Sequence, residues 1–379
     1  MVELCERTKC TGCNACVNIC SKAAIAMVHE EDGFLYPVIE ASGCTGCGAC
    51  RKVCEVLAEY KKERDTNLKV VAAVHSEPDE RNHSQSGGLF FALAEQVIAE
   101  GGVVYGASYE EEFKVCHTRA ETLEEVEKQR GSKYVQSSTD MTFRQVEADL
   151  QTGRKVLYSG TSCQIAGLLS FLKIKHCKQD NLVTVDLVCH GVPSPLVFQK
   201  YLGFLERIWN SKLTSVNLRN KKFGWHSCEE TYRDRNNKNY QIHLWRELYF
   251  ANYMLRPSCE KCPYATTDKP ADITVGDYWN IENIHNNFYN DNKGISLGII
   301  RSEKAWNLFE KSKVNYKETG LDECLQPRLE APSKLCRQSK AFWSDYYRMD
   351  FKDLMKKYSE YGGIKFRVKR KAMKLAGKW

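Results

Sequence analysis

The chain has 379 residues, which is too long for a ferredoxin alone and sufficient for two or three domains. Hydrophobic residues make up 42% and aromatic residues 11%, enough to bury a core. The formal net charge of +7 is mildly basic and does not identify a partner by itself.

The chain contains 18 cysteines, and its first residues include both acids and bases without an apolar stretch typical of a signal peptide. No segment approaches the ~20 apolar residues that a helix needs to span a bilayer. We therefore expect a cytoplasmic protein whose thiols are free or bind metal rather than forming disulfides.

Eight cysteines form two runs near the N-terminus, each with the spacing C-x2-C-x2-C-x3-C. The runs comprise Cys10, Cys13, Cys16 and Cys20, then Cys44, Cys47, Cys50 and Cys54. This is the bacterial pattern for two [4Fe–4S] clusters, in which the fourth cysteine of a run binds the other cluster. One cluster should take Cys54 with the first three cysteines, and the other should take Cys20. Zinc sites use pairs of CxxC rather than a repeated run of four, so zinc and disulfide interpretations are disfavoured.

A proline usually follows the fourth cysteine of such a run, and here the residues are Ser21 and Glu55. Because proline shapes only the backbone at that point, this departure leaves the predicted ligands unchanged.

Beyond this module, apolar strand signals alternate with helical periodicity. Strands are predicted at 70–74, 103–105, 155–159, 182–189, 213–218, 240–244, 273–275 and 295–300. Helices are predicted from 89 to about 100, at 164–172, 194–209 and 302–312, with a charged linker at 59–67 and a polar loop at 77–85. This pattern predicts an α+β ferredoxin module followed by an α/β body with a mixed sheet. The predicted domains are 1–60, 68–150, 151–312 and a helical basic tail at 313–379.

Four cysteines of the body stand in unusual contexts. Cys163 lies at a strand-to-helix turn, where helix amides favour a thiolate, and Cys189 ends an apolar strand. Cys259 and Cys262 form a CxxC between two prolines. Together they could hold a third [4Fe–4S] cluster, whereas the CxxC alone could equally be a zinc site or a redox dithiol.

Six short motifs follow the module in a fixed order: SGGLFFALAE, SGTSCQIAGL, LVCHGVPSP, LRNKKFGW, RPSCEKC and ADITVGDYW. In this order they resemble the coenzyme F420 hydrogenase/dehydrogenase beta-subunit family over residues 1 to 310. The resemblance implies a flavoprotein that binds FAD and iron–sulfur clusters. It also implies that Cys163, Cys189, Cys259 and Cys262 are ligands of a cluster near the flavin.

The turn Ser86-Gly87-Gly88 precedes a predicted helix and could hold a phosphate of FAD, although such a turn is often purely structural. Thr161 and Gly191, which belong to two of the motifs, are the other predicted flavin contacts. His190 is the predicted catalytic residue because its pKa lies near neutrality, although a structural role is an equal alternative. Lys221, Lys222 and Trp225 could face the flavin or an anionic substrate, or only solvent.

The sequence therefore predicts an oxidoreductase that moves electrons between [4Fe–4S] clusters and a flavin, to or from coenzyme F420 or a related two-electron acceptor. One alternative is a reductase of the same build that acts on a sugar or tetrapyrrole intermediate in a bacterium lacking F420. Another is a non-enzymatic electron-transfer subunit. Expected partners are a ferredoxin-like carrier and an organic acceptor. Seven basic residues at 365–379 also suggest a membrane surface or an acidic protein rather than nucleic acid, although a solvated tail is an equal alternative.

Overall fold

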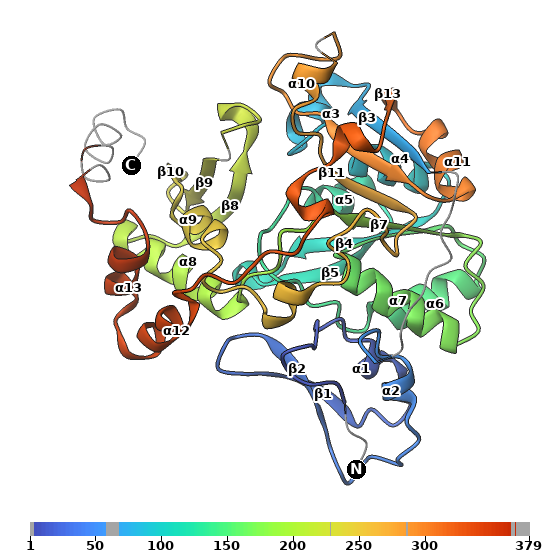
Figure 1. The fold of residues 1–379 in the computed structure, drawn as a ribbon, viewed down its shortest axis with the longest axis horizontal. Helices are drawn as coiled ribbons and strands as arrows, with labels where there is room; N and C mark the ends of the chain where they lie inside the picture. Colours follow the sequence, from blue (N-terminus) through green and yellow to red (C-terminus); the bar gives the residue numbers. More distant parts are fainter. Residues whose placement is uncertain (1–3, 58–67, 228, 286, 365–367, 369–379) are drawn as a thin grey trace.

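The N-terminal module forms a separate lobe at one end of the molecule in the computed structural model (Figure 1). The structure describes residues 4–57, 68–227, 229–285, 287–364 and 368. The lobe contains α1 (Ala15–Ile19), β1 (Ile25–His29), β2 (Leu35–Ile39) and α2 (Ala49–Lys52). The two strands pair as an antiparallel hairpin, and α1 contacts α2. The predicted ferredoxin-type module is confirmed, while the predicted linker at 59–67 lies outside the described residues.

A mixed sheet of eight strands forms the centre of the body, in the order β13-β3-β12-β11-β7-β6-β4-β5. The strands are β3 (Lys69–His75), β4 (Val103–Tyr109), β5 (Val115–Ala120), β6 (Val156–Ser159), β7 (Leu182–Leu187), β11 (Ile273–Asp277), β12 (Ser296–Ile300) and β13 (Val314–Thr319). The predicted mixed α/β body is confirmed. The predicted boundary between residues 150 and 151 divides this one sheet.

Five of these strands run in the same direction. β4, β6, β7 and β11 pair in parallel, and β3 has the same direction because both it and β11 are antiparallel to β12. Their carboxyl ends therefore share one edge of the sheet, which is where open α/β sheets bind ligands. Cys163 follows β6 and Cys189 follows β7 at this edge, and the Ser86-Gly87-Gly88 turn follows β3 there.

Helices cover both faces of the sheet. One face packs against α4 (Leu89–Ala99), α5 (Leu123–Gln129) and α11 (Glu303–Lys311). The opposite face packs against α6 (Thr142–Gln151) and α7 (Ser162–Ile174). The N-terminal lobe sits against this second layer, because α1 contacts both α6 and α7 (Figure 1).

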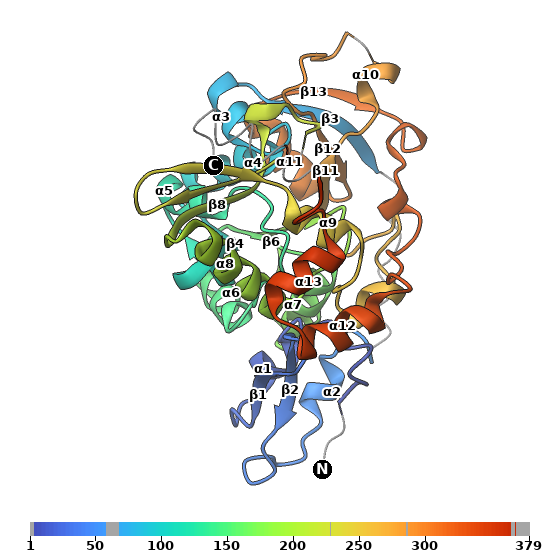
Figure 2. The same cartoon turned by 90° about the vertical axis from the view of Figure 1, so that its left-hand side faces the viewer.

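A third unit stands beside the sheet in Figure 1 and faces the viewer in the turned view of Figure 2. It consists of β8 (Leu213–Asn220), β9 (Glu229–Asp234), β10 (Asn239–Ile242), α8 (Pro195–Trp209), α9 (Leu244–Phe250), α12 (Ser339–Arg348) and α13 (Phe351–Tyr358). α8 begins as the sequence predicts, since the Ser194 hydroxyl accepts the Val197 amide and Pro195 is the first helical residue. An aromatic core that includes Tyr201, Trp245 and Phe342 holds these elements together.

The remaining elements are short: α3 (Pro78–His83), α10 (Ile281–Ile284) and 3₁₀ turns at Glu111–Phe113, Lys221–Phe223, Pro257–Lys261, Asp322–Cys324 and Pro327–Leu329. No helix among the described residues is long and apolar enough to cross a bilayer.

Several predicted elements differ from the structure. The polar loop at 77–85 contains α3, which Pro78 starts and acidic residues support in its first turn. The predicted strand at 240–244 ends at Ile242, because Leu244 begins α9. The prediction of a helical segment from residue 313 is wrong at its start, since Val314–Thr319 pair with β3. The basic residues of 365–379 lie outside the described residues.

Gly87 marks a place where the backbone itself requires glycine. A methyl group at Gly87 would lie 2.2 Å from the Ala73 carbonyl oxygen and 2.5 Å from the Ser296 amide nitrogen. Both neighbours belong to central strands that cannot move apart without breaking the sheet. Gly203, in the interior of α8, has no such neighbour within 4 Å.

We therefore expect Gly87→Ala to destabilise the protein by roughly 3 kcal/mol through steric strain. Gly203→Ala should instead stabilise it by about 0.5–1 kcal/mol, because alanine loses less backbone entropy in a helix. Thermal unfolding followed by circular dichroism tests both variants. Equal effects of the two substitutions would show that Gly87 is not sterically constrained.

Candidate functional site

The first cysteine site is a small cavity inside the N-terminal lobe. Its lining contains Cys10, Cys13, Cys16 and Cys54, together with Cys5. The first three come from the loop before α1 and from α1 itself, and Cys54 follows α2. The structure therefore groups Cys54 with the first run, as the crossover pattern predicts. That these thiols bind iron stays a prediction.

The second cysteine site is a matching cavity at the outer end of the lobe. Its lining contains Cys20, Cys44, Cys47 and Cys50. Cys47 is exposed to solvent, whereas Cys50 is buried. All cysteines among the described residues are free, so the disulfide alternative finds no support there.

Arg256 is a buried cation at the first cysteine site that the sequence interpretation missed. It is 1% exposed, and its guanidinium donates to the carbonyl oxygens of Cys10 (2.7 Å) and Leu35 (3.0 Å) and to the side chain of Gln136 (2.8 Å). It also lies 4.4 Å from the ring centre of Tyr36. The only sequence signal that pointed to Arg256 was its position directly before the CxxC loop, in the motif RPSCEKC.

A hydrogen bond from Cys5 and the positive charge of Arg256 lower the pKa of Cys10 to about 6, against the opposing effect of burial. Arg256 Nη2 lies 3.7 Å from Cys10 Sγ. A thiolate, which is the form that binds iron, is therefore favoured at this position.

The four body cysteines come together at the carboxyl edge of the sheet. Cys163 is in the first turn of α7, and Cys189 lies two residues beyond the end of β7. The Gly191 amide donates to Cys189 Sγ at 3.4 Å, and a methyl group at Gly191 would lie 3.4 Å from Cys259 Cβ. Gly191 thus fits between two of the predicted ligands.

The sequence predicts a thiolate at Cys163, but without a neighbouring cation the structure favours the protonated thiol. Burial raises the pKa of Cys163 well above its usual value, and the charges of Glu55, Cys262 and Cys189 raise it further. Burial and the neighbouring Cys189 likewise raise the pKa of Cys259 to about 12. Four crowded, partly buried thiols fit a site for a cationic metal centre, which would hold them all as thiolates.

Two direct contacts join the N-terminal lobe to this body site. Cys13 packs against α7, where a methyl group at Gly167 would lie 2.8 Å from Cys13 Sγ. Cys163 lies one turn earlier on the same helix, about 6 Å along its axis. Glu55, which follows Cys54, accepts the Tyr264 hydroxyl at 2.6 Å, and Tyr264 follows the CxxC by two residues.

The Ser86-Gly87-Gly88 turn lies three strands away from the thiols, about 14 Å along the sheet edge. The Ser296 hydroxyl accepts the Leu89 amide at 3.4 Å, so a protein group already occupies part of the α4 N-terminus. Lys221 Nζ donates to the Ser86 carbonyl oxygen at 2.8 Å. A ligand that touches both this turn and the thiol site must be elongated.

Lys221 is a partly buried lysine that donates to the carbonyl oxygens of Ser86 and Arg81. Burial, with the charges of Arg81 and Arg219, lowers the pKa of Lys221 to about 7. Arg81 pairs with Asp291 at 2.8 Å, and Arg219 pairs with Asp277 at 2.5 Å. Because burial and then the repulsion among these cations lower the pKa of Lys221, an anionic ligand such as a phosphate would stabilise its charged form.

Other predicted residues have roles within the protein. Trp225 is buried, donates to Asp277 at 2.7 Å and stacks on Trp279, while the Lys222 side chain is exposed. Thr161 caps α7 with Gln164, and its hydroxyl lies 3.2 Å from Cys163 Sγ.

His190 lies next to the thiols and is held firmly by its neighbours. Its Nε2 lies 2.8 Å from Asn252 Oδ1, and the rings of Tyr249 and Phe250 contact it edge-on. Burial lowers the pKa of His190, which favours the neutral imidazole. These contacts suit a structural role, and its predicted catalytic role stays a prediction.

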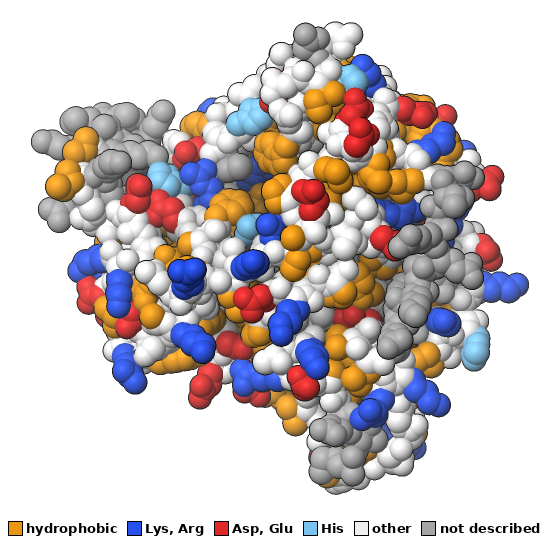
Figure 3. All heavy atoms as spheres, in the orientation of Figure 1, with side chains coloured by type: hydrophobic (Ala, Val, Ile, Leu, Met, Phe, Trp, Pro, Cys, Tyr) orange, Lys and Arg blue, Asp and Glu red, His pale blue; other side chains and the backbone are white. Residues whose placement is uncertain are grey.

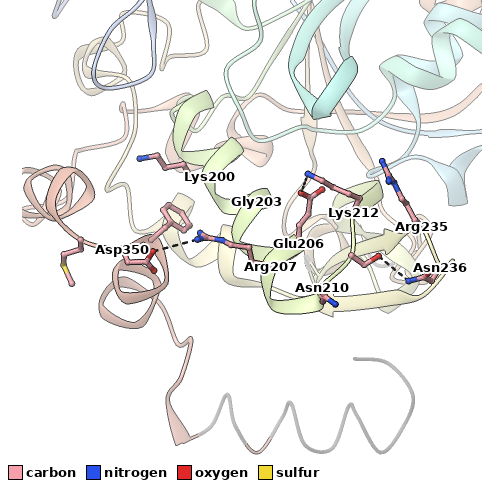
Figure 4. Close-up of a pocket in the computed structure, with 12 residues that line it drawn as sticks. Lys200, Gly203, Glu206, Arg207, Asn210, Lys212, Arg235, Asn236 and Asp350 are labelled. Carbon is pink, nitrogen blue, oxygen red and sulfur yellow. Dashed lines mark hydrogen bonds and ion pairs between the residues drawn. The ribbon is translucent and has the colours of Figure 1, made fainter.

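A large open groove of about 1000 Å³ lies elsewhere, between α8, the β9–β10 turn and α13 (Figure 4). Its lining combines Lys200, Arg207, Lys212 and Arg235 with Glu206 and Asp350. Glu206 pairs with Lys212 at 2.6 Å, and Arg207 lies 3.9 Å from Asp350. The described residues that line the groove include no cysteine, so it is separate from the thiol sites.

On the face drawn in Figure 3, acidic side chains are interspersed with basic ones, so the positive net charge does not form one continuous patch there. Among the described residues, this face therefore lacks the continuous basic surface typical of nucleic-acid binding.

Comparisons with known proteins identify two regions. Residues 9–58 match the 4Fe-4S dicluster domain, and residues 153–321 match the family model for the C terminus of the coenzyme F420 hydrogenase/dehydrogenase beta subunit. No curated protein matches the chain. Among solved structures, the F420-reducing [NiFe] hydrogenase complex from Methanosarcina barkeri, in a xenon derivative, is similar with a TM-score of 0.45 and 18% identity, over 70% of this chain and 88% of that one.

The family-model match at residues 153–321 contains five of the six motifs read from the sequence, from SGTSCQIAGL to ADITVGDYW. The chain thus joins a segment that matches the 4Fe-4S dicluster domain to a segment that matches the C-terminal part of the coenzyme F420 hydrogenase/dehydrogenase beta-subunit family.

Proposed function

We propose that this protein is an oxidoreductase that transfers electrons between a carrier protein and an organic two-electron acceptor. It would use three [4Fe–4S] clusters held by its cysteines, together with a bound FAD. The observation that carries this proposal is the contact between Cys13 of the first cysteine site and the helix that holds Cys163. Cys13 touches α7, the helix whose first turn holds Cys163, so electrons would have a short path between lobe and body.

The cysteine groupings supply the ligands. Cys10, Cys13, Cys16 and Cys54 would hold one cluster, and Cys20, Cys44, Cys47 and Cys50 would hold another. Cys163, Cys189, Cys259 and Cys262 would hold the third. When bound, the clusters supply one-electron transfer.

The exposure of Cys47 supports the outer end of the lobe as the docking place of the carrier. Gly46 and Gly48 flank it, and a methyl group at either would meet no atom within 4 Å. A ferredoxin-like protein could therefore approach this loop closely. Docking there would place its own cluster near the outer site.

The support for FAD comes more from Lys221 than from the glycines. Gly87 is required by the neighbouring strands, but Lys221 presents a cation beside Ser86, with Arg81 and Arg219 close by. These residues would bind the diphosphate at one end of an elongated ligand. When bound, FAD supplies the exchange between single electrons and electron pairs.

The acceptor we propose is coenzyme F420 or a related two-electron acceptor, as the family name suggests. Reduction assays with purified chain, reduced ferredoxin and a panel of deazaflavin and non-deazaflavin acceptors separate this choice from a sugar or tetrapyrrole substrate. A chain that reduces none of them alone would act as a subunit of a larger complex.

Anaerobically purified protein should contain about 12 iron atoms per chain, four for each of three clusters. Cys262→Ser should lower the iron content to about eight, because it removes a ligand of the body site only. Cys324→Ser is the matched control, since Cys324 is buried outside all three groups and bonds to the Leu321 carbonyl oxygen. A wild-type content of about eight would contradict the third cluster.

Flavin affinity should fall as pH rises through about 7, because Lys221 then loses the proton that attracts a phosphate. Lys221→Met should weaken flavin binding about tenfold at acidic pH and remove most of this pH dependence. Fluorescence titration of the flavin-depleted protein measures both effects. The control variant is Lys222→Met, since the neighbouring Lys222 side chain is exposed. If the two variants had the same flavin affinity and the same pH dependence, Lys221 would be excluded from the flavin site.

A further inference from the structure

A histidine and three glutamates gather outside the thiol sites, where the third unit meets the chain after α13. His243 precedes α9, Glu247 lies in that helix, Glu229 begins β9 and Glu360 follows α13. His243, Glu229 and Glu247 are each about one-fifth exposed, whereas Glu360 is 56% exposed. The group is thus semi-enclosed and open on one side.

The two ring nitrogens of His243 face different partners. Nε2 lies 3.2 Å from Glu247 Oε1 and 4.0 Å from Glu360 Oε2, and the three ligand atoms of this group lie within 4.8 Å of one another. Nδ1 faces Glu229 Oε2 at 3.9 Å. A metal-bound histidine commonly has a carboxylate on its second nitrogen, which fixes the ring and increases its basicity.

The geometry points to a site for one divalent transition-metal cation, bound by His243 Nε2, Glu247 and Glu360, with Glu229 orienting the imidazole. Ligands about 2.1 Å from a metal lie roughly 3.0 to 3.4 Å from each other. The His243–Glu247 distance already satisfies this spacing. The exposed Glu360 side chain needs to move by only about 1 Å to reach it.

Charge and pre-organisation support a cation here. Even with a protonated imidazole, three carboxylates leave the group with two excess negative charges. The carboxylates are also held in place: Glu229 accepts Gln241 Nε2 at 3.0 Å, and Glu247 Oε2 accepts the Glu360 amide at 2.8 Å. That second bond leaves Glu247 Oε1 directed at the histidine.

The ligand set indicates the kind of metal. One imidazole with carboxylates suits manganese, iron or zinc, whereas calcium and magnesium prefer oxygen ligands alone. Since Glu360 follows α13, the ion would fasten the C-terminal helices to α9. α9 in turn leads through Asn252 towards the CxxC loop, so the ion would stabilise the unit beside the third thiol group.

The test uses the full protein with its iron–sulfur clusters intact, after removal of loosely bound metal by a chelator. Mn²⁺ is added, and the unbound ion is measured from its electron paramagnetic resonance signal. We expect one saturable Mn²⁺ site, lost in His243→Gln and in Glu360→Gln. Glu229→Gln should weaken binding by about 10–100-fold, as loss of a residue that orients a ligand does. Mn²⁺ should also raise the unfolding temperature of the wild type and not that of His243→Gln.

His285→Gln is the matched control, because His285 also faces a glutamate, Glu323, at 3.4 Å but has no second carboxylate among its contacts with described residues. It should bind Mn²⁺ like the wild type. Because Glu360 is exposed, its variant is expected to fold normally, so its loss of binding would reflect the missing ligand. The proposal would be overturned if the wild type had no saturable Mn²⁺ site. It would also be overturned if His243→Gln and Glu360→Gln bound Mn²⁺ as the control does. In either case the group would consist of ordinary ion pairs.

Discussion

The buried guanidinium of Arg256 is the interaction on which the arrangement of the two halves depends. It bonds to the backbone of Cys10 and Leu35 in the N-terminal lobe, while its own backbone leads into the loop with Cys259. A buried charge is costly unless its donors are satisfied, and here they meet carbonyl and amide oxygens. Its removal would leave those acceptors unpaired in the interior, at a cost of about 1–3 kcal/mol each.

The same contact links structure to electron transfer. Arg256 fixes the lobe so that Cys13 rests on α7 and Glu55 meets Tyr264, which brings the first cysteine cavity next to the body thiols. A fixed positive charge beside Cys10 also favours the thiolate there. Positive charge close to a cluster is one of the means by which a protein sets its reduction potential. The packing of the lobe against the body and, with the cluster proposed at Cys10, its reduction potential would therefore depend on one side chain.

Much of this organisation could be read from the sequence, because it is encoded locally. The spacing of the cysteine runs predicted the grouping with Cys54, and Ser194-Pro195 predicted the start of α8. The missed features are non-local. Arg256 acts on a residue 246 positions away, and the low thiolate tendency of Cys163 results from burial that no single segment encodes. The strand β13 was missed because its pairing with β3 joins distant segments of the chain.

The central claim is that electrons reach the flavin through the N-terminal cysteines, and stopped-flow bleaching of the flavin by reduced ferredoxin tests it most directly. In Cys13→Ser, flavin content and direct chemical reduction should persist, while reduction by ferredoxin should lose most of its rate. Cys324→Ser, at a buried position outside the three groups, should behave like the wild type. If Cys13→Ser accepted electrons from ferredoxin as fast as the wild type, the lobe would not be where electrons enter.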